Sequence, residues 1–323
     1  MTISTRLTDQ LGITHPILSA PMALAGGGAL AAAVTNAGGL GLIGGGYADA
    51  DWISEQFAAA GNARVGCGFI TWNLMEKLDD DPDALGRVLD RKPAMLMLSF
   101  GDPAPLAADI AAASVPLACQ VQTLRDAKRA ADCGATLIIA QGAEAGGHGE
   151  KRATMTFVPE VADWLSLHHP DVLLCAAGGI ADGRGLAAAL MLGADGVLVG
   201  SRLWASEDAL VHPAMLDAAV EATGDDTIRS SVMDIARHYK WPERYTARVL
   251  KNAFTDRWHN DIDGLLAVAD SEAARWKAAW GEGDVTTANT FVGEATGLIA
   301  DIQPAGVLVE TMVREAEERL ARY

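Results

Sequence analysis

Residues 116–140 read PLACQVQTLRDAKRAADCGATLIIA and contain one complete strand–helix–strand unit. An apolar run at 116–121 is followed by an alanine-rich, helix-compatible segment at 124–133, which Thr123 can cap at its N-terminus. A second apolar run at 136–140 begins shortly after this segment. Nearly continuous apolar strands of this kind are typical of a parallel sheet that is covered by helices.

The same unit recurs along the whole chain. Short apolar runs that are typical of strands lie at 16–19, 40–43, 65–70, 95–100, 116–121, 136–140, 172–176 and 197–200. Helix-compatible segments lie between and after them, at 29–36, 51–60, 83–90, 105–112, 124–133, 158–167, 185–192 and 207–222. Eight β-then-α units favour closure into a (β/α)8 TIM barrel over an open doubly wound sheet, so we predict an α/β fold of that type.

The last hundred or so residues follow a different pattern. The strand–helix alternation stops near Gly224, and amphipathic helical stretches are predicted at 231–238, 243–258 and 307–322. We therefore divide the chain into a barrel over residues 1–223 and a helical cap, or C-terminal subdomain, over residues 224–323. The cap could cover the mouth of the barrel or complete its core, and the sequence leaves both options open.

Charge and composition limit the partners of the protein. The chain has 25 Lys and Arg against 42 Asp and Glu, a formal net charge of −17, which would repel nucleic acid and anionic membranes. It contains no uncharged apolar run of about 18 residues and no apolar segment within its first ten. We therefore expect a cytoplasmic protein with no nucleic-acid and no membrane partner. The four cysteines lack C-x-x-C spacing, which indicates reduced thiols and no metal site.

The chemistry is expected in residues 137–150, LIIAQGAEAGGHGE, where the sixth strand runs into a polar, glycine-rich loop. Active sites of such barrels lie in the loops at the carboxyl ends of the strands. Gln141 stands at the strand end, and His148 lies in the loop beside Gly146 and Gly147. Because histidine is suited to proton abstraction near neutral pH, we predict that His148 is catalytic.

Two glycine-rich turns follow the last two strands. Gly178 and Gly179 come after the seventh strand, and Gly200 and Ser201 come after the eighth. Barrels often bind a phosphate group in these loops, because glycine lets backbone N–H groups approach an anion. The alternative is that these are tight turns that need glycine only for their backbone geometry.

The first strand ends in Ala20, Pro21 and Met22. Proline ends the strand, and the small residues around it leave space for a flat ring against the main chain, although a simple strand end explains the pattern equally well.

Other types of active-site chemistry lack support in the sequence. No lysine lies in a predicted strand, no strand carries an H-x-H pair, and no G-x-S-x-G elbow occurs.

Together these motifs resemble the nitronate monooxygenase family, formerly called 2-nitropropane dioxygenases. The resemblance rests on A-P-M at 20–22, N-A-G-G-L-G at 36–41, Q-G-A-E-A-G-G-H-G at 141–149, A-A-G-G-I-A-D-G at 176–183 and G-A-D-G-V-L-V-G-S-R at 193–202. It covers about residues 6–213 and implies an FMN-dependent barrel. Related flavoproteins include NADH:quinone reductases and an FMN-dependent enoyl-ACP reductase, so the motifs specify the superfamily more sharply than the reaction.

Carried over by position, the resemblance implies a set of cofactor contacts and a reaction. His148 would be the base toward nitroalkanes or the partner of an anionic nitronate, and oxygen would complete the oxidation to a carbonyl compound and nitrite. The FMN-binding residues would be Ala20, Pro21 and Met22 along the ring system, Gln120, Gln141, Gly146 and Gly147 beside it, and Gly178, Gly179, Gly200 and Ser201 at the phosphate. The partners would be a small nitronate or nitroalkane and O2, with a homodimer as one option.

Two alternatives remain at this stage, and two positions depart from the family pattern. The alternatives are an NAD(P)H-dependent FMN reductase acting on a quinone or an enoyl thioester, and a flavin-free barrel that binds a phosphorylated metabolite. Gly68 stands where many members have a flavin-contacting asparagine, and Asn73 is nearby. Gln120 stands where some relatives carry a lysine, so a positive charge near the flavin is missing.

Overall fold

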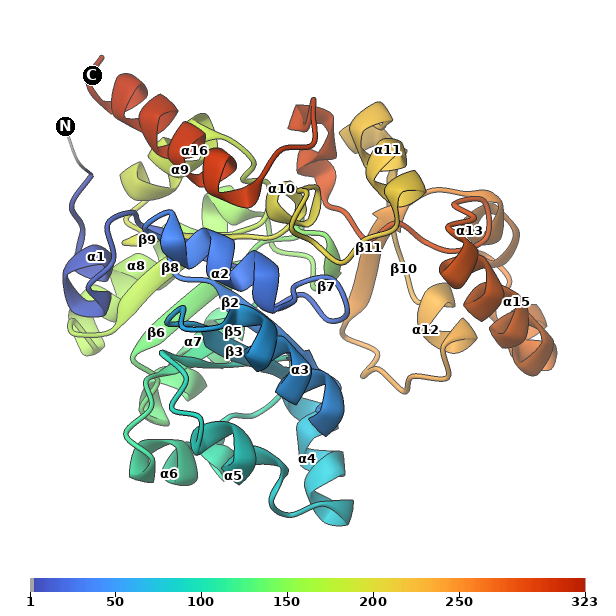
Figure 1. Ribbon diagram of the computed structural model, residues 1–323, viewed down its shortest axis with the longest axis horizontal. Coiled ribbons are helices and arrows are strands. Elements are labelled where there is room, and N and C mark those ends of the chain that lie inside the picture. Colours follow the sequence, from blue (N-terminus) through green and yellow to red (C-terminus); the bar gives the residue numbers. More distant parts are fainter. Residues whose placement is uncertain (1–2, 323) are drawn as a thin grey trace.

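Eight parallel strands form a nearly closed barrel in the computed structural model, which describes residues 3–322 (Figure 1). Around the barrel their order is β1-β9-β8-β6-β5-β4-β3-β2. A parallel bridge between Leu18 and Leu40 joins the two ends of this order. The strands are β1 (Ile17–Ser19), β2 (Leu42–Gly46), β3 (Gly66–Ile70), β4 (Leu96–Ser99), β5 (Leu117–Val121), β6 (Leu137–Gln141), β8 (Leu173–Ala177) and β9 (Gly196–Val199). The predicted (β/α)8 TIM barrel is confirmed.

Helices cover the outside of the barrel in the predicted alternation. They are α2 (Gly28–Asn36), α3 (Ala50–Ala60), α4 (Thr71–Asp80), α5 (Ala84–Leu89), α6 (Ala104–Ala112), α7 (Leu124–Asp132), α8 (Thr154–His168), α9 (Gly183–Met191) and α10 (Ser201–Trp204), with α1 (Arg6–Leu11) before the first strand. Thr123 caps α7 as expected, since its side chain accepts a hydrogen bond from the Asp126 N–H. The helix predicted at 207–222 begins only at Pro213, as α11 (Pro213–Glu221), because the fixed φ of proline suits a first helical position.

The barrel strands are buried on both faces. In β6, Leu137 and Ile139 belong to the apolar cluster inside the barrel, whereas Ile138 and Ala140 belong to the cluster under the helices. The cysteines are free thiols among the described residues, and burial raises the pKa of Cys67 to about 12. The side chains within these strands therefore form the core, and functional side chains are expected only at the strand ends.

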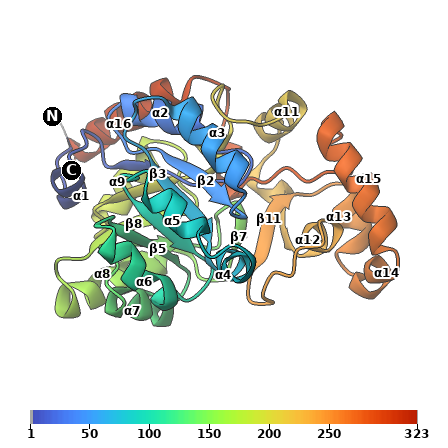
Figure 2. The ribbon, with the colours of Figure 1, turned by 60° about the horizontal axis from the view of Figure 1, so that its bottom comes forward.

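The tail contains a small antiparallel sheet as well as helices. Two of its strands, β10 (Thr227–Ser230) and β11 (Thr246–Leu250), pair with each other, and β11 also pairs with β7 (Gly147–Gly149) from the barrel loop. The helices around them are α12 (Val232–Ala236), α13 (Ala253–Trp258), α14 (Ile262–Ala267) and α15 (Ala269–Glu282). Figure 2 shows these helices to one side of the barrel, with β11 between them and the barrel.

The continuous helix predicted at 243–258 is therefore wrong in its first part. Residues 246–250 read TARVL, in which Ala247 and Val249 are buried while their neighbours Thr246 and Arg248 are half-buried. This alternation with a period of two residues, together with pairing on both edges, favours a strand over a helix. Pairing with distant residues thus overrides the local helical pattern.

The final helix returns to the barrel. α16 (Ala305–Leu320) packs along α9 and α2 (Figure 1), so the tail serves both the cap and the barrel wall. The division at residues 223 and 224 stays a prediction. Within the described part of the chain, no helix has the length and apolar character needed to cross a membrane.

Candidate active site

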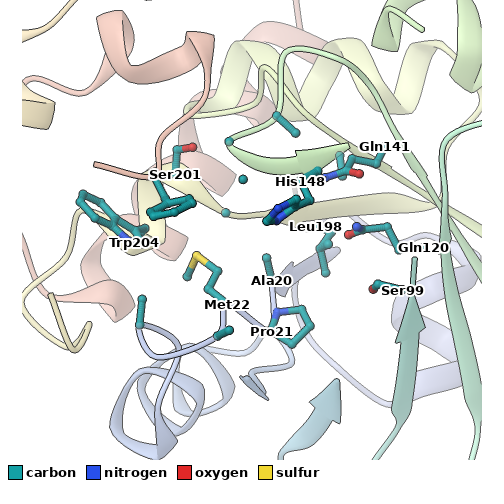
Figure 3. Close-up of a pocket in the computed structure, with 18 of the residues that line it drawn as sticks. Ala20, Pro21, Met22, Ser99, Gln120, Gln141, His148, Leu198, Ser201 and Trp204 are labelled. Carbon is teal, nitrogen blue, oxygen red and sulfur yellow. Dashed lines mark hydrogen bonds between the residues drawn. The ribbon is translucent and has the colours of Figure 1, made fainter. Parts of the chain in front are cut away.

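One cavity at the carboxyl ends of the strands, between the barrel and the cap, collects every predicted site residue. Figure 3 shows the His148 ring near its centre. The predicted residues that line it are Ala20, Pro21, Met22, Gln120, Gln141, Gly146, Gly147, His148, Gly178, Gly179, Gly200 and Ser201. They are brought together because the loops after parallel barrel strands meet at one end of the barrel. Their individual roles remain predictions.

The two glycine-rich turns offer free backbone donors to this cavity. Gly178 and Gly179 have φ of 101° and 75°, a region that favours glycine. Within residues 3–322, the N–H groups of Gly178, Gly179, Gly200 and Ser201 donate no hydrogen bond. The Ser201 hydroxyl accepts a hydrogen bond of 2.9 Å from the Gly293 N–H, which connects this turn to the tail. Several free N–H groups on a glycine cradle are suited to binding an anion.

The end of β1 forms a closely packed apolar wall. A Cβ added at Gly68 would lie 2.4 Å from Pro21 Cγ, and one added at Gly44 would lie 2.3 Å from the Met22 carbonyl oxygen. The position of Pro21 therefore accounts for glycine at 68. Asn73 does not take the place of a side chain at position 68, because it is not among the residues that line the cavity.

Two glutamines of the barrel take different positions at the cavity. The amide of Gln141 is held on both sides, since its oxygen accepts from Gln122 Nε2 at 2.7 Å and its Nε2 donates to the His148 carbonyl at 3.0 Å. Gln120 is 9% exposed and lines the cavity as a neutral side chain. As a result, Arg237 from the cap is the one lysine or arginine among the described lining residues.

His148 is fixed from several directions. It lies in β7 opposite Ala247, and its ring stacks on Trp241 with 3.4 Å between ring centroids and 5° between the planes. Its Nε2 lies 3.0 and 2.9 Å from the two carboxylate oxygens of Asp234 in α12. The Phe100 ring approaches edge-on at 6.2 Å. The imidazole is therefore buried and oriented before any substrate binds.

Burial lowers the pKa of His148, and this effect outweighs the nearby Asp234 carboxylate, which acts to raise it; Arg237 and Arg229 lower it further. A neutral ring can donate an Nε2 proton to Asp234, and no described residue hydrogen-bonds to Nδ1. An imidazole that donates from Nε2 in this way would have one free basic nitrogen at neutral pH. The neighbouring Tyr47 phenol is neutral as well, because burial raises its pKa to about 12.

Sequence reasoning missed the cap residues that surround His148 and the cavity. Asp234 is 86 positions from His148, and no motif spacing connects them. Trp241 and Trp280 line the cavity, whereas Trp258 and Trp276 pack in the buried core of the cap. The concentration of tryptophans in the tail was a visible signal, but it could not separate these two groups.

Comparisons with known proteins identify the family of the chain. A family model described as nitronate monooxygenase matches residues 4–65 and 68–315, and its gap falls on β3 just before Gly68. A nitronate monooxygenase of Metarhizium robertsii is 35% identical over 91% of this chain and 88% of that protein. FabK from Thermotoga maritima has a TM-score of 0.87 at 31% identity, covering 99% of this chain and 98% of that chain.

A further solved structure, a nitroalkane oxidase from Streptomyces ansochromogenes, has a TM-score of 0.82 at 25% identity, covering 98% of this chain and 99% of that chain. The family model and the relative from Metarhizium both extend across most of the chain, through the barrel and into the tail. The shared region includes the loop that carries His148 and the two glycine-rich turns. The chain therefore belongs to the nitronate monooxygenase family of oxidoreductases.

Proposed function

We propose that the protein is an FMN-dependent nitronate monooxygenase that oxidises alkyl nitronates, and with them nitroalkanes, to carbonyl compounds and nitrite with O2. The observation that carries this proposal is His148. Its buried ring has its Nε2 bound to Asp234 and its Nδ1 free, in the same cavity as the free N–H groups of the glycine turns. Oxidation of a nitroalkane by FMN requires a base that removes a proton from carbon and a site that binds the phosphate of the cofactor, and this cavity contains candidates for both.

The residues present fit FMN. The free N–H groups of Gly178, Gly179, Gly200 and Ser201 are suited to its phosphate. Pro21 and Met22, which pack closely against Gly68 and Gly44, line the cavity and would lie along its ring system. Gln141 and Gly146 would lie beside that ring. Bound FMN would take electrons from the substrate and pass them to oxygen.

The chain itself would bind the substrate, exclude water and manage one proton. Nδ1 of His148 would accept the proton from the carbon that bears the nitro group, or would hold it while the anionic nitronate reacts. Trp241 covers one face of the imidazole and keeps solvent from it.

The part of the cavity between the barrel and the cap supports an alkyl substrate. Its lining there is apolar and aromatic, and the half-exposed Leu24 and Leu210 stand at it together with Trp280 and Phe291. Apolar walls of this type bind hydrocarbon chains by removing them from water. Arg237 is already engaged by Asp234, so the described lining offers no free cation for a substrate carboxylate.

Oxygen uptake and nitrite release with butyl-1-nitronate, without NADH or NADPH, would test the proposal on protein that is yellow as purified. His148→Ala should lose activity on the neutral nitroalkane by about 10²-fold or more, whereas His168→Ala, an exposed histidine on α8, should retain it. Rapid anaerobic bleaching by NADH or NADPH, with no nitrite formed, would instead establish the alternative, an FMN reductase acting on a quinone or an enoyl thioester. A colourless protein that binds no FMN would contradict both.

A further inference from the structure

We propose that Asp234 is a positioning residue that holds His148 in the tautomer with the proton on Nε2, so that Nδ1 is the basic atom. The cap would thereby complete the active site of the barrel. Asp234 is not among the residues that line the cavity, so it acts through His148 and does not touch the substrate. The inference rests on the proposed function only for the role of His148 as a base.

The contact between the two side chains is close and buried. Both carboxylate oxygens of Asp234 lie within 3.0 Å of Nε2, and the two side chains are 4% and 8% exposed. A carboxylate can only accept a hydrogen bond, so the nitrogen that faces it must carry the proton. Because a neutral imidazole has one N–H, Nδ1 is left with its lone pair.

The other contacts of the ring do not select a tautomer. Trp241 stacks on the flat face of the imidazole, and a half-turn of the ring about its χ2 torsion would preserve that stack. The backbone of His148 is held by Gln141 and by pairing with β11, but neither contact reaches the ring nitrogens. The Asp234 contact would be lost on such a turn, so it alone determines which nitrogen is protonated and where it points.

Arg237 holds the carboxylate of Asp234 in place. Nη2 of Arg237 donates to Asp234 Oδ1 at 2.7 Å, and its Nε donates to the Met233 carbonyl at 3.1 Å. The guanidinium also lies over the rings of Tyr239, Trp276 and Phe291, with 5.1, 5.7 and 5.0 Å to the ring centroids. These contacts fix the arginine, and through it the carboxylate.

The charge balance of this cluster favours a neutral His148. Asp234 and Arg237 cancel each other, so protonation of the imidazole would leave a net positive charge in a buried site. Arg229, from β10, adds a further positive charge nearby, and Tyr47 is a neutral phenol. Burial of the ring, together with the two arginines, lowers the pKa of His148. A neutral ring with a determined tautomer is the state that a general base requires.

The first test measures the tautomer directly and needs no substrate. Protein labelled with ¹⁵N in its seven histidines would be observed by two-bond ¹H–¹⁵N correlation at pH 8, and the signal of His148 would be identified by its loss in His148→Gln. The expected pattern is a protonated Nε2 and an unprotonated Nδ1. A protonated Nδ1 in the wild-type protein would overturn the proposal, whatever the enzyme proves to catalyse.

The second test is Asp234→Asn, in which the amide can donate to Nε2 and so favours a proton on Nδ1. We expect the tautomer signal to change and kcat/KM with a neutral nitroalkane to fall by about 10²-fold or more, while FMN remains bound. Asp270→Asn is the matched control, because Asp270 is an exposed cap residue that lies 3.7 Å from His238. It should stay within about twofold of wild type.

If Asp234→Asn fails to fold because Arg237 is left unpaired, the double variant Asp234→Asn with Arg237→Met removes both buried charges and takes its place. The same loss of the Nε2–H tautomer is expected there. A variant that keeps the wild-type tautomer and wild-type kcat/KM would show that Asp234 has a structural role only. If wild-type protein oxidises no nitronate or nitroalkane, the proposed function fails, but the tautomer still decides the role of Asp234.

Discussion

Adding a side chain at Gly68 is expected to destabilise the protein. A Cβ at this position would lie 2.4 and 2.6 Å from Pro21 Cγ and Cβ and 3.4 Å from Met97 Cβ. Real Cβ atoms do not approach carbon atoms so closely, and the rigid pyrrolidine ring cannot turn away. Overpacking of a filled site costs about 1–3 kcal/mol, against which replacing a strand glycine returns about 0.5–1 kcal/mol. From the middle of both ranges, the net expectation for Gly68→Ala is a loss of about 1 kcal/mol in the free energy of unfolding.

The matched control is Gly86→Ala in α5, where an added Cβ meets nothing within 4 Å. There the helix should gain about 0.5–1 kcal/mol. Urea unfolding of both variants followed by circular dichroism would measure the two free energies, and flavin absorbance after gel filtration would measure retained FMN. Since Pro21 lines the cavity, Gly68→Ala should also lower FMN retention. Equal stability and equal flavin content in wild type and Gly68→Ala would refute the account of Gly68.

Three other predictions concern the cavity. Because burial lowers the pKa of His148 below its ordinary value, kcat/KM for a neutral nitroalkane should be constant above about pH 6.5 and fall at lower pH. The unfolded chain binds that proton more readily than the folded protein, so the free energy of unfolding should also fall below about pH 6.5. A rise of kcat/KM or of the free energy of unfolding on acidification would contradict a neutral base. Leu210→Ser should raise KM for hexyl-1-nitronate about fivefold and leave nitroethane nearly unchanged, as steady-state oxygen uptake would show, whereas the exposed Leu167→Ser on α8 should affect neither. Gly179→Ala and Gly12→Ala both place alanine at positive φ, and each should lower the free energy of unfolding in urea by about 1–2 kcal/mol. Only Gly179 lines the cavity, so only Gly179→Ala should weaken FMN binding in a fluorescence titration. Equal FMN affinity in the two variants would exclude Gly179 from the phosphate site.

The parts of the fold that sequence reasoning predicted are those with local causes. The run Leu137–Gln141 is apolar enough to be a buried strand whatever surrounds it, and Thr123 caps α7 through a contact three residues away. The strand ends then determine the cavity, because loops after parallel strands of a barrel meet at one end. For this reason Gln141, His148, Gly178 and the other predicted residues could be placed together before the structure was considered.

The parts that it missed depend on contacts between distant segments. Residues 246–250 have an ambiguous local pattern, and they form a strand because Gly147–Gly149 and residues 227–230 pair with them. Asp234 meets His148 only because that small sheet brings α12 to the barrel loop. No periodicity or spacing in the sequence predicts this contact, because an aspartate in a five-residue helix has the same local pattern whether or not it is buried.

Two functions of the cavity, binding of the phosphate and positioning of His148, depend on different parts of the chain that meet at the sheet containing β7. The proposed phosphate contacts come from turns of the barrel, whereas Asp234 and Trp241, which hold the imidazole, come from the cap. β7 belongs to both, since it continues from the loop after β6 and forms the edge of the sheet β10-β11-β7. A displacement of β11 would therefore move His148 relative to the glycine turns without altering those turns. Substitutions in the buried face of β11, such as Val249→Ala, should thus reduce turnover more than FMN affinity, and the ratio of the two effects measures how far the cap, not the barrel, positions the base.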